Sequence, residues 1–250
     1  MSRDTIRLPH DAYRLLQTLR AAGHSAYVVG GCVRDSLLGR TPGDWDICTS
    51  ARPEEMRRLF ADHQLILTGE KHGTVAVILH GKPYEMTTYR LDGSYRDHRH
   101  PDNVQFVDDL AADLARRDFT INALALCLNK ERYGELVDPF GGLEDMDELT
   151  IRTPLDPDVT FSDDPLRMMR AVRFSAQLGY DIEEATRLAI CELSQTLEKI
   201  SAERIRTELL KLLVSPHPEM LRICRETGMT AVFLPEFDQM AQTVQNNPHH

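Results

Sequence analysis

Two aspartates one residue apart are the residues of this sequence whose type and spacing most directly suggest chemistry. Asp44 and Asp46 lie on either side of Trp45, at the start of a segment that continues with Ile47. On a strand over 44–48 the two side chains would point to the same face, because side chains alternate along a strand. Two carboxylates held side by side are costly unless cations neutralise them. The pair therefore predicts a metal site, with Mg²⁺ as the expected occupant.

A pair of glycines precedes these aspartates. Gly30 and Gly31 end the apolar run 26–29, and a helix is expected to begin near Val33. Glycine lets backbone N–H groups approach an anion closely, and the N-terminus of a helix favours a phosphate. Either signal is common when taken singly, because most Asp-x-Asp pairs and most glycine pairs lie in turns. Their combined order predicts phosphate and metal binding within one short stretch.

The flanking pattern predicts the scaffold that would position these groups. Helical apolar spacing covers 11–22, and a second helix is expected over 53–60 after the start signal at Pro53. Strands are expected at 26–29, 44–48, 74–79 and 83–88. A turn at Gly81-Lys82-Pro83 would join the last two strands as a hairpin.

Glu85 lies on the second strand of that hairpin and shares a face with Thr87. It is the candidate for a third carboxylate beside Asp44 and Asp46. The alternative, an exposed strand glutamate with no metal role, stays open.

The remainder of the chain changes in character. The segment 89–103 has no periodicity and many polar side chains, which predicts a long functional loop, poorly ordered without substrates. From Leu110 onward strands nearly vanish, and the acidic run 144–148 is typical of a solvated helix face. The sequence thus predicts an α+β fold with a mixed head over 1–140 and an all-helical neck over 141–250.

The run from Arg116 to Ala123 contains side chains suited to a ribose. Asp118 and Asn122 are four residues apart, so on a helix running through Leu128 they would share a face and could hydrogen-bond a pair of hydroxyls. Arg117 would then contact phosphate. Asp118 as a simple helix N-cap is a compatible alternative.

A second polar pair lies on the helix expected over 164–178. Asp164 and Arg167 are three residues apart, and together they could present a fixed acceptor and donor to the edge of a base. A plain salt bridge between them is the alternative. Arg170 and Arg173 project from the same polar side. With the arginines of the ribose-suited run, these residues could surround a triphosphate with positive charge.

Composition limits the class of protein. The 250 residues are 42% hydrophobic and 27% charged, which is ordinary for a globular protein of one or two domains. A net charge of −10 argues against general nucleic-acid binding but not against a local basic surface. The sequence contains neither a membrane-spanning run nor a signal-peptide core, so we expect a cytoplasmic protein. Its five cysteines lack paired or metal-ligand spacing and should be reduced and mostly buried.

Five motifs in order along the chain resemble those of the class II template-independent nucleotidyltransferases, which comprise tRNA CCA-adding enzymes and bacterial poly(A) polymerases. The matching segments are Gly30–Asp35 with Asp44-x-Asp46, Arg116–Ala123, Asp138–Gly142, Asp163–Phe174 and Glu203–Leu213. In that family they serve as the metal motif, the ribose motif, a hinge, the base template and the helix that closes the neck. The first residue of the template motif is Asp163 here, where the family usually has glutamate.

The resemblance implies a polymerase-beta-like head that adds C, C and A to the 3′ end of tRNA from CTP and ATP. Two Mg²⁺ ions would be held by Asp44 and Asp46, and no organic cofactor or obligate protein partner is expected. The implied nucleotide-binding residues are Gly30, Gly31, Arg34, Arg117, Asp118, Asn122, Asp164, Arg167, Arg170 and Arg173.

Three other activities stay open: a bacterial poly(A) polymerase, an enzyme that adds only C or only A, and an inactive RNA-binding relative. Family members continue beyond the neck with a body and tail that grip tRNA. We therefore expect the sequence, which ends at His250, to be truncated.

Overall fold

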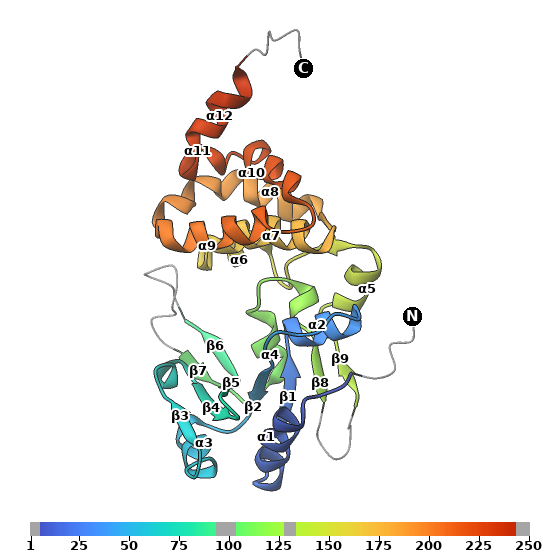
Figure 1. The fold of residues 1–250 in the computed structure, drawn as a ribbon, viewed down its shortest axis with the longest axis vertical. Coiled ribbons are helices and arrows are strands. Elements are labelled where there is room, and N and C mark those ends of the chain that lie inside the picture. Colours follow the sequence, from blue (N-terminus) through green and yellow to red (C-terminus); the bar gives the residue numbers. More distant parts are fainter. Residues whose placement is uncertain (1–5, 94–103, 128–133, 244–250) are drawn as a thin grey trace. The chain divides into compact units, whose positions relative to one another are not determined.

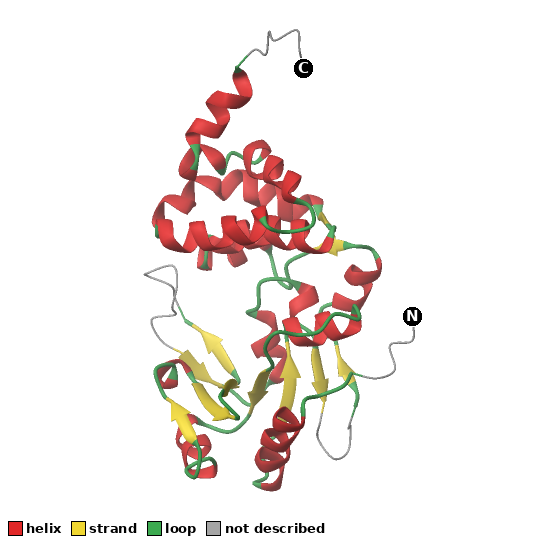
Figure 2. Ribbon diagram, in the orientation of Figure 1, coloured by secondary structure: helices red, strands yellow, loops and turns green. Residues whose placement is uncertain are grey.

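The structure is a computed structural model that describes residues 6–93, 104–127 and 134–243. It divides into two compact units (Figure 1). The first comprises Met1–Glu148 with Thr153–Leu155, and the second comprises Leu149–Arg152 with Asp156–His250. Strands and helices mix in the first unit, whereas the second is nearly all helical (Figure 2). The functional division into a head over 1–140 and a neck over 141–250 stays a prediction.

A mixed sheet organises the first unit. Among the described residues it has seven strands in the order β3-β4-β5-β2-β1-β8-β9, and all neighbours are antiparallel except the parallel pair β2 and β5. The strands are β1 Ala26–Val29, β2 Asp46–Thr49, β3 Gln64–Ile66, β4 Thr74–Leu79, β5 Lys82–Thr88, β8 Ala125–Cys127 and β9 Leu136–Val137. The expected hairpin of β4 and β5 is confirmed. Its turn, however, lies at His80 and Gly81, which both have positive φ, as a type I′ turn requires. The expected turn at Gly81-Lys82-Pro83 is corrected, because Lys82 and Pro83 already belong to β5.

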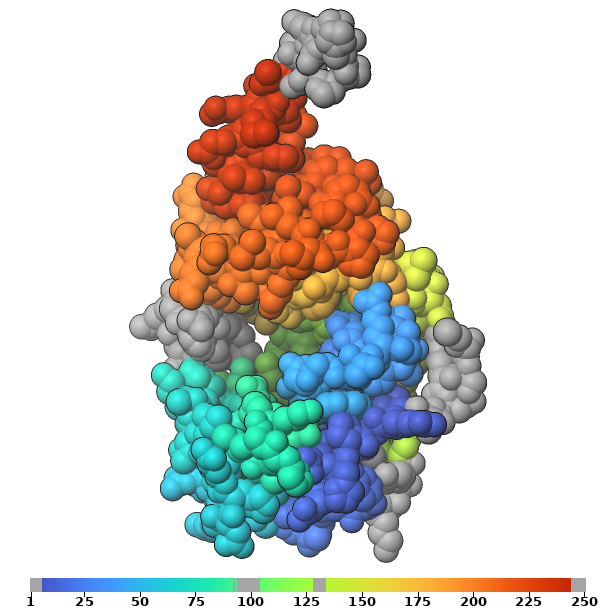
Figure 3. Space-filling model, in the orientation of Figure 1, coloured from blue at the N-terminus to red at the C-terminus, as the bar shows by residue number. Residues whose placement is uncertain are grey.

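The two faces of this sheet bury different clusters. On one face Tyr27, Val29, Cys48 and Ala125 pack with Leu114 of α4 in a buried apolar cluster. The alternate residues of the same strands point the other way, and α1 and α3 contact β1 and β4. The helices of this unit are α1 His10–Ala21, α2 Gly31–Leu37, α3 Pro53–Leu59, α4 Leu110–Ala115 and α5 Gly142–Asp147, with 3-10 turns η1 Glu70–His72 and η2 Thr120–Asn122. In the space-filling view, the segment from α3 to β5, coloured cyan to teal, forms part of the visible surface of this unit (Figure 3).

Three expectations about this unit are corrected. The helix expected from Asp118 through Leu128 is a single turn, η2, followed by strand β8. A short apolar run suits a buried strand as well as a helix, and here pairing with β1 and β9 decides the outcome. The expected loop begins as strand β6, Arg90–Asp92, which pairs with β7, Val104–Phe106; residues 94–103, where disorder was expected, lie outside the described residues. The acidic run is not solvated throughout, because Asp145 is buried.

The second unit packs helices around α7. Its helices are α6 Pro157–Asp163, α7 Leu166–Leu178, α8 Glu184–Leu193, α9 Ala202–Leu213, α10 Leu221–Glu226, α11 Thr230–Phe233 and α12 Pro235–Gln242, with 3-10 turns η3 Ser194–Lys199 and η4 Pro218–Met220. The apolar side of α7, including Met168 and Val172, is buried together with Leu212 of α9. One short parallel pair, β10 Thr150–Ile151 with β11 Asp181–Ile182, corrects the expectation of a purely helical neck. None of the helices described in either unit has the length and apolar character needed to span a bilayer.

Candidate active site

Asp46 is the first residue of β2, and the strand register identifies its neighbours on the two adjacent strands. It lies opposite Val29 on β1, and because Ile47 pairs with Met86 in parallel register, Glu85 is its neighbour on β5. Burial raises the pKa of the Asp46 carboxyl to about 6, helped by the negative charges of Asp44 and Glu85 and opposed by Arg117. The structure therefore places both other candidate carboxylates within electrostatic reach of Asp46.

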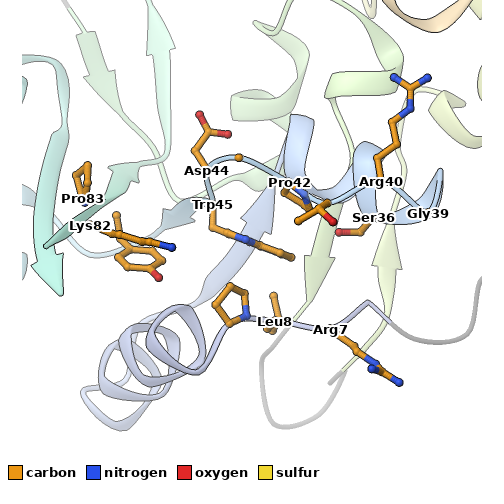
Figure 4. Close-up of a pocket in the computed structure, with 14 residues that line it drawn as sticks. Arg7, Leu8, Ser36, Gly39, Arg40, Pro42, Asp44, Trp45, Lys82 and Pro83 are labelled. Carbon is orange, nitrogen blue, oxygen red and sulfur yellow. The ribbon is translucent and has the colours of Figure 1, made fainter. Parts of the chain in front are cut away.

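Asp44 precedes the strand, which begins two residues later than expected. Its side chain is exposed, and it points away from the indole of Trp45, which turns toward Leu8 (Figure 4). The backbone therefore keeps the alternation of an extended chain at this point without being paired in the sheet.

These carboxylates fit a divalent cation on electrostatic grounds. Burial and the two neighbouring negative charges make ionised Asp46 unfavourable, and a bound cation would relieve that cost. In the part of the chain that the structure describes, however, no group of three or more His, Cys, Asp or Glu side chains is assembled closely enough to hold a metal ion. Metal binding by Asp44 and Asp46, with Glu85 as a third ligand, stays a prediction.

The glycine pair brings an arginine close to the backbone. Gly30 has φ 80° and ψ −139°, a conformation open mainly to glycine, and a Cβ added there would lie 3.0 Å from Nη1 of Arg117. The amide of Gly30 donates to the carbonyl oxygen of Leu124 at 3.0 Å, so this N–H is already used in a backbone hydrogen bond. The cation of Arg117 thus lies where the sequence predicts a phosphate.

A chain of buried polar side chains joins the glycine motif to the ribose motif. Arg34 contacts Asp35 at 2.7 Å and donates to the side-chain oxygen of Asn122. Asn122 in turn donates to Oδ1 of Asp118 at 2.9 Å. Arg34, Asn122 and Asp118 are each only 6–7% exposed. The contact expected of a four-residue spacing between Asp118 and Asn122 is therefore made, although it is made across η2 and not on an α-helix.

Asp113 is a residue of this region that the sequence reasoning missed. Its side chain is fully buried and lies 2.8 Å from Nη2 of Arg116 and 3.5 Å from Nη2 of Arg117. Burial by itself would raise its pKa, but the two guanidinium groups outweigh burial and lower it. The available signal was the spacing of Asp113 three and four residues before two arginines on a helix. Nε of Arg117 is buried without a hydrogen-bond partner, which leaves a donor for a ligand.

The segment Asp138–Gly142 braces the ribose motif. Asp138 accepts hydrogen bonds from the amides of Gly142 and Leu143 at 2.8 and 2.9 Å, which caps α5. Asp145 on that helix accepts from the hydroxyl of Thr120 at 2.6 Å. The turn η2, which carries Asn122, is thus tied to α5 through its first residue, Thr120.

Replacing Gly142 with alanine is expected to disturb this brace. The added Cβ would lie 2.3 Å from the carbonyl oxygen of Thr120, a backbone atom that cannot move without moving η2. We expect a loss of about 1–3 kcal/mol in the free energy of unfolding, measured by urea denaturation. Gly43→Ala is the control, because nothing lies within 4 Å of its added Cβ. Equal stability of the two variants would contradict the brace.

In the second unit each residue of the predicted pair, Asp164 and Arg167, has a partner outside the pair. Oδ2 of Asp164 lies 2.9 Å from Nη2 of Arg204 on α9, and Oδ1 accepts from the amide of Leu166 at 3.1 Å. Arg167 donates to the carbonyl oxygen of Thr160 at 3.4 Å. Asp164 is therefore oriented by α9 and by the start of α7.

Arg173 is committed to the interior of this unit. It is 7% exposed, contacts the buried carboxylate of Glu208 on α9, and lies 3.8 Å from the ring centroid of Phe174. Arg170 lies 5.5 Å from the same ring. Because the arginines of the predicted positive surface divide between the two units, that surface stays a prediction.

Comparison with known proteins supports the family suggested by the motifs. Residues 26–152 match the poly A polymerase head domain, and residues 179–240 match a probable RNA- and SrmB-binding site of polymerase A. A CCA-adding enzyme of Lactobacillus helveticus is 52% identical over 82% of this chain and 50% of its own length. Another, from Geobacillus thermodenitrificans, is 47% identical over 90% of this chain and 54% of its own. The chain spans about half the length of the curated relatives it matches.

Solved structures agree with this assignment. The crystal structure of the Bacillus stearothermophilus CCA-adding enzyme in complex with CTP has a TM-score of 0.82 and 43% identity, covering 91% of this chain and 54% of that one. The Thermotoga maritima CCA-adding enzyme complexed with tRNA has a TM-score of 0.77 and 28% identity, covering 97% of this chain and 55% of that one. The expected fold class is confirmed, and enzymes of this kind generally use divalent metal ions. The chain belongs to the class II template-independent nucleotidyltransferase family of CCA-adding enzymes and poly(A) polymerases.

Proposed function

We propose that this chain carries the catalytic and nucleotide-selecting parts of an enzyme that adds C, C and A to the 3′ end of tRNA from CTP and ATP. The observation that carries the proposal is the gathering of two kinds of group at one end of β1 and β2. Asp46 with its neighbouring carboxylates suits metal ions, and Arg117 beside Gly30 suits a phosphate. The names of the relatives supply the substrate class.

The reaction joins the RNA 3′ oxygen to the α-phosphorus of the nucleotide. The bond from that phosphorus to the bridging oxygen breaks, pyrophosphate leaves, and the hydroxyl proton passes to water. Two Mg²⁺ ions bound by Asp44 and Asp46 would activate the hydroxyl and neutralise the phosphate charge.

The side chains of the first unit bind and orient the nucleotide. Arg117 contacts the phosphates, and its buried Nε supplies a donor without a competing partner. Asp118 and Asn122 contact the ribose, and their mutual hydrogen bond, with Arg34 behind Asn122, holds them before the substrate arrives. Preorganisation of this kind lowers the cost of binding.

The second unit carries the residues proposed to select the base. Both oxygens of Asp164 are oriented by Arg204 and the Leu166 amide, and each keeps a lone pair for a ligand. Arg167 supplies the donors. With Arg173 held by Glu208, we assign Arg173 to positioning α7, whereas Arg170 stays a candidate for direct contact.

Nucleotide incorporation tests the proposal. The chain is incubated with tRNA lacking its 3′ end and with each nucleoside triphosphate in turn, with Mg²⁺ present and then chelated. We expect sequential incorporation of C, C and A that stops on chelation, with GTP and UTP rejected. A long A tail would instead identify a poly(A) polymerase, and addition of one base type a narrower enzyme. Absence of incorporation would favour the RNA-binding relative.

A further inference from the structure

The sheet of the first unit offers a second approach to Asp46. In the strand order, β1 and β8 lie on one side of β2, and β5, β4 and β3 lie on the other. The cluster proposed for the nucleotide belongs to the first side, because Gly30 follows β1 and Asn122 precedes β8. On the other side Glu85 on β5 continues the face that carries Asp46. Glu85, as the strand neighbour of Asp46, therefore connects this side to the predicted metal site.

A pocket of about 910 Å³ occupies that other side. Glu85 lies at its lining together with Ile66 and Ala76, which are cross-strand partners on β3 and β4. Ala76 also pairs directly with Glu85, so these three residues continue across the sheet as a floor. The floor offers apolar surface next to a carboxylate.

The lining of this pocket also carries positive charge. Lys71 of η1 and Arg90 line it, so two cations face the single carboxylate of Glu85. Lys71 is exposed and has no hydrogen-bond or ion-pair partner within the described ranges. Arg90 is anchored, because its guanidinium donates to the carbonyl oxygen of His72. A salt bridge of 3.1 Å between Arg57 of α3 and Glu70 of η1 links η1 to α3. The lining is therefore suited to an extended anion with apolar parts.

We propose that this pocket binds the sugar–phosphate backbone and terminal ribose of the RNA 3′ end, with Lys71 as a phosphate contact. This inference rests on the proposed function. In phosphoryl transfer the attacking oxygen and the leaving oxygen lie roughly in line on opposite sides of the phosphorus. The two substrates must therefore reach the carboxylates from opposite sides. With the nucleotide on the side of Gly30 and Asn122, the side of Glu85 is left for the RNA.

Lys71→Ala tests the pocket through RNA binding without turnover. The probe is a fluorescently labelled single-stranded RNA that ends in CC, titrated with the 250-residue chain in the absence of nucleotide. We expect the Kd to rise about three- to tenfold, and the slope of log K against log salt to become shallower by about 0.7, the value for one phosphate contact on a single strand. Unlike a structural change, loss of one contact alters this salt dependence.

Lys82→Ala is the matched control. Lys82 is an exposed lysine on β5, but it lines a different pocket, together with Arg7 and Trp45 (Figure 4). We expect it to bind the RNA as the parent chain does. Weaker binding in Lys82→Ala with unchanged binding in Lys71→Ala would overturn the proposal. So would a raised KM for CTP in Lys71→Ala with an unchanged Kd for RNA, because the pocket would then hold the triphosphate.

The measurements distinguish failure of the proposed function from failure of the pocket as an RNA site. If the parent chain incorporates no nucleotide but its RNA binding depends on Lys71, the proposed function fails and the pocket stands. If the parent chain incorporates nucleotide, and Lys71→Ala matches it in both RNA affinity and KM for RNA, the pocket fails and the proposed function stands.

Discussion

Asp46→Asn is expected to abolish nucleotide incorporation while making the folded chain more stable at neutral pH. The loss of activity should be about 10³-fold or more, because a carboxylate that holds metal supports several kcal/mol of transition-state stabilisation. The gain in stability has the same origin, which is the buried negative charge of Asp46. Asp46 is held where its negative charge is unfavourable, and the neutral amide removes that charge without removing the side chain's volume.

The sign of the stability change follows from the pKa. The folded state raises the pKa of Asp46 from 3.8 to about 6, so it binds the proton more tightly than the unfolded chain does. Stability is therefore lost as the pH rises from about 4 to about 6, and the whole cost is present at pH 7. That cost is roughly 3 kcal/mol before solvent screening. The advantage of Asp46→Asn should disappear below about pH 4, where the carboxyl is protonated in both states.

Urea denaturation at pH 7 and at pH 4, in the absence of divalent metal, measures this effect. Asp44→Asn is the matched comparison, because it also removes a proposed metal ligand but its side chain is exposed. We expect lost activity with a smaller gain in stability, because the charge of Asp44 adds to the pKa shift of Asp46 but burial is the larger cause. Adding MgCl₂ should raise the Tm of the parent chain and have less effect on Asp46→Asn. Full activity in Asp46→Asn, or lower stability than the parent at pH 7, would contradict the assignment.

Glu208→Ala is expected to destabilise the second unit by about 3–5 kcal/mol, because it leaves the buried guanidinium of Arg173 without its carboxylate. Both side chains lie at less than 10% exposure, so water cannot easily replace the lost partner. Glu203→Ala on the same helix is the control, since Glu203 is exposed and its loss should change stability by less than about 0.5 kcal/mol.

The two units can be followed separately in this experiment. The single tryptophan, Trp45, belongs to the first unit, so its fluorescence reports unfolding there. Far-ultraviolet circular dichroism is dominated by helices, which the second unit supplies in greater number among the described residues. We expect Glu208→Ala to shift the dichroism transition and leave the fluorescence transition in place. Replacing both Arg173 and Glu208 with methionine should recover much of the loss. A change below 1 kcal/mol in Glu208→Ala would mean that the pair is not structural.

Local pattern was sufficient for the order of elements around the glycine motif. The apolar run at 26–29, the glycine pair and the helix after it appear as β1, Gly30 and α2. The alternating segments β4 and β5 form the expected hairpin, although its turn lies at His80 and Gly81. These features depend on neighbours in the chain, which is why the sequence predicts them. The five motifs likewise led to the correct family without any knowledge of packing.

The tertiary structure decided which polar groups meet. Sequence reasoning paired Asp164 with Arg167 and left Arg173 for the nucleotide, but α9 places Arg204 against Asp164 and Glu208 against Arg173. It also grouped Asp145 with a solvated acidic run, although Asp145 is buried and accepts a hydrogen bond from Thr120, 25 residues earlier in the chain.

The physical reason is that an ion pair depends on the distance between two charges in space. The segments that bring these partners together are far apart along the chain, so local spacing does not reveal them. The same holds for the segment after Asp118, where pairing between strands outweighed helical spacing and made β8. The sequence by itself determined the family, the candidate chemistry and most of the elements. Only the folded chain decided the burial that raises the pKa of Asp46, and which arginines are held by carboxylates within their own unit.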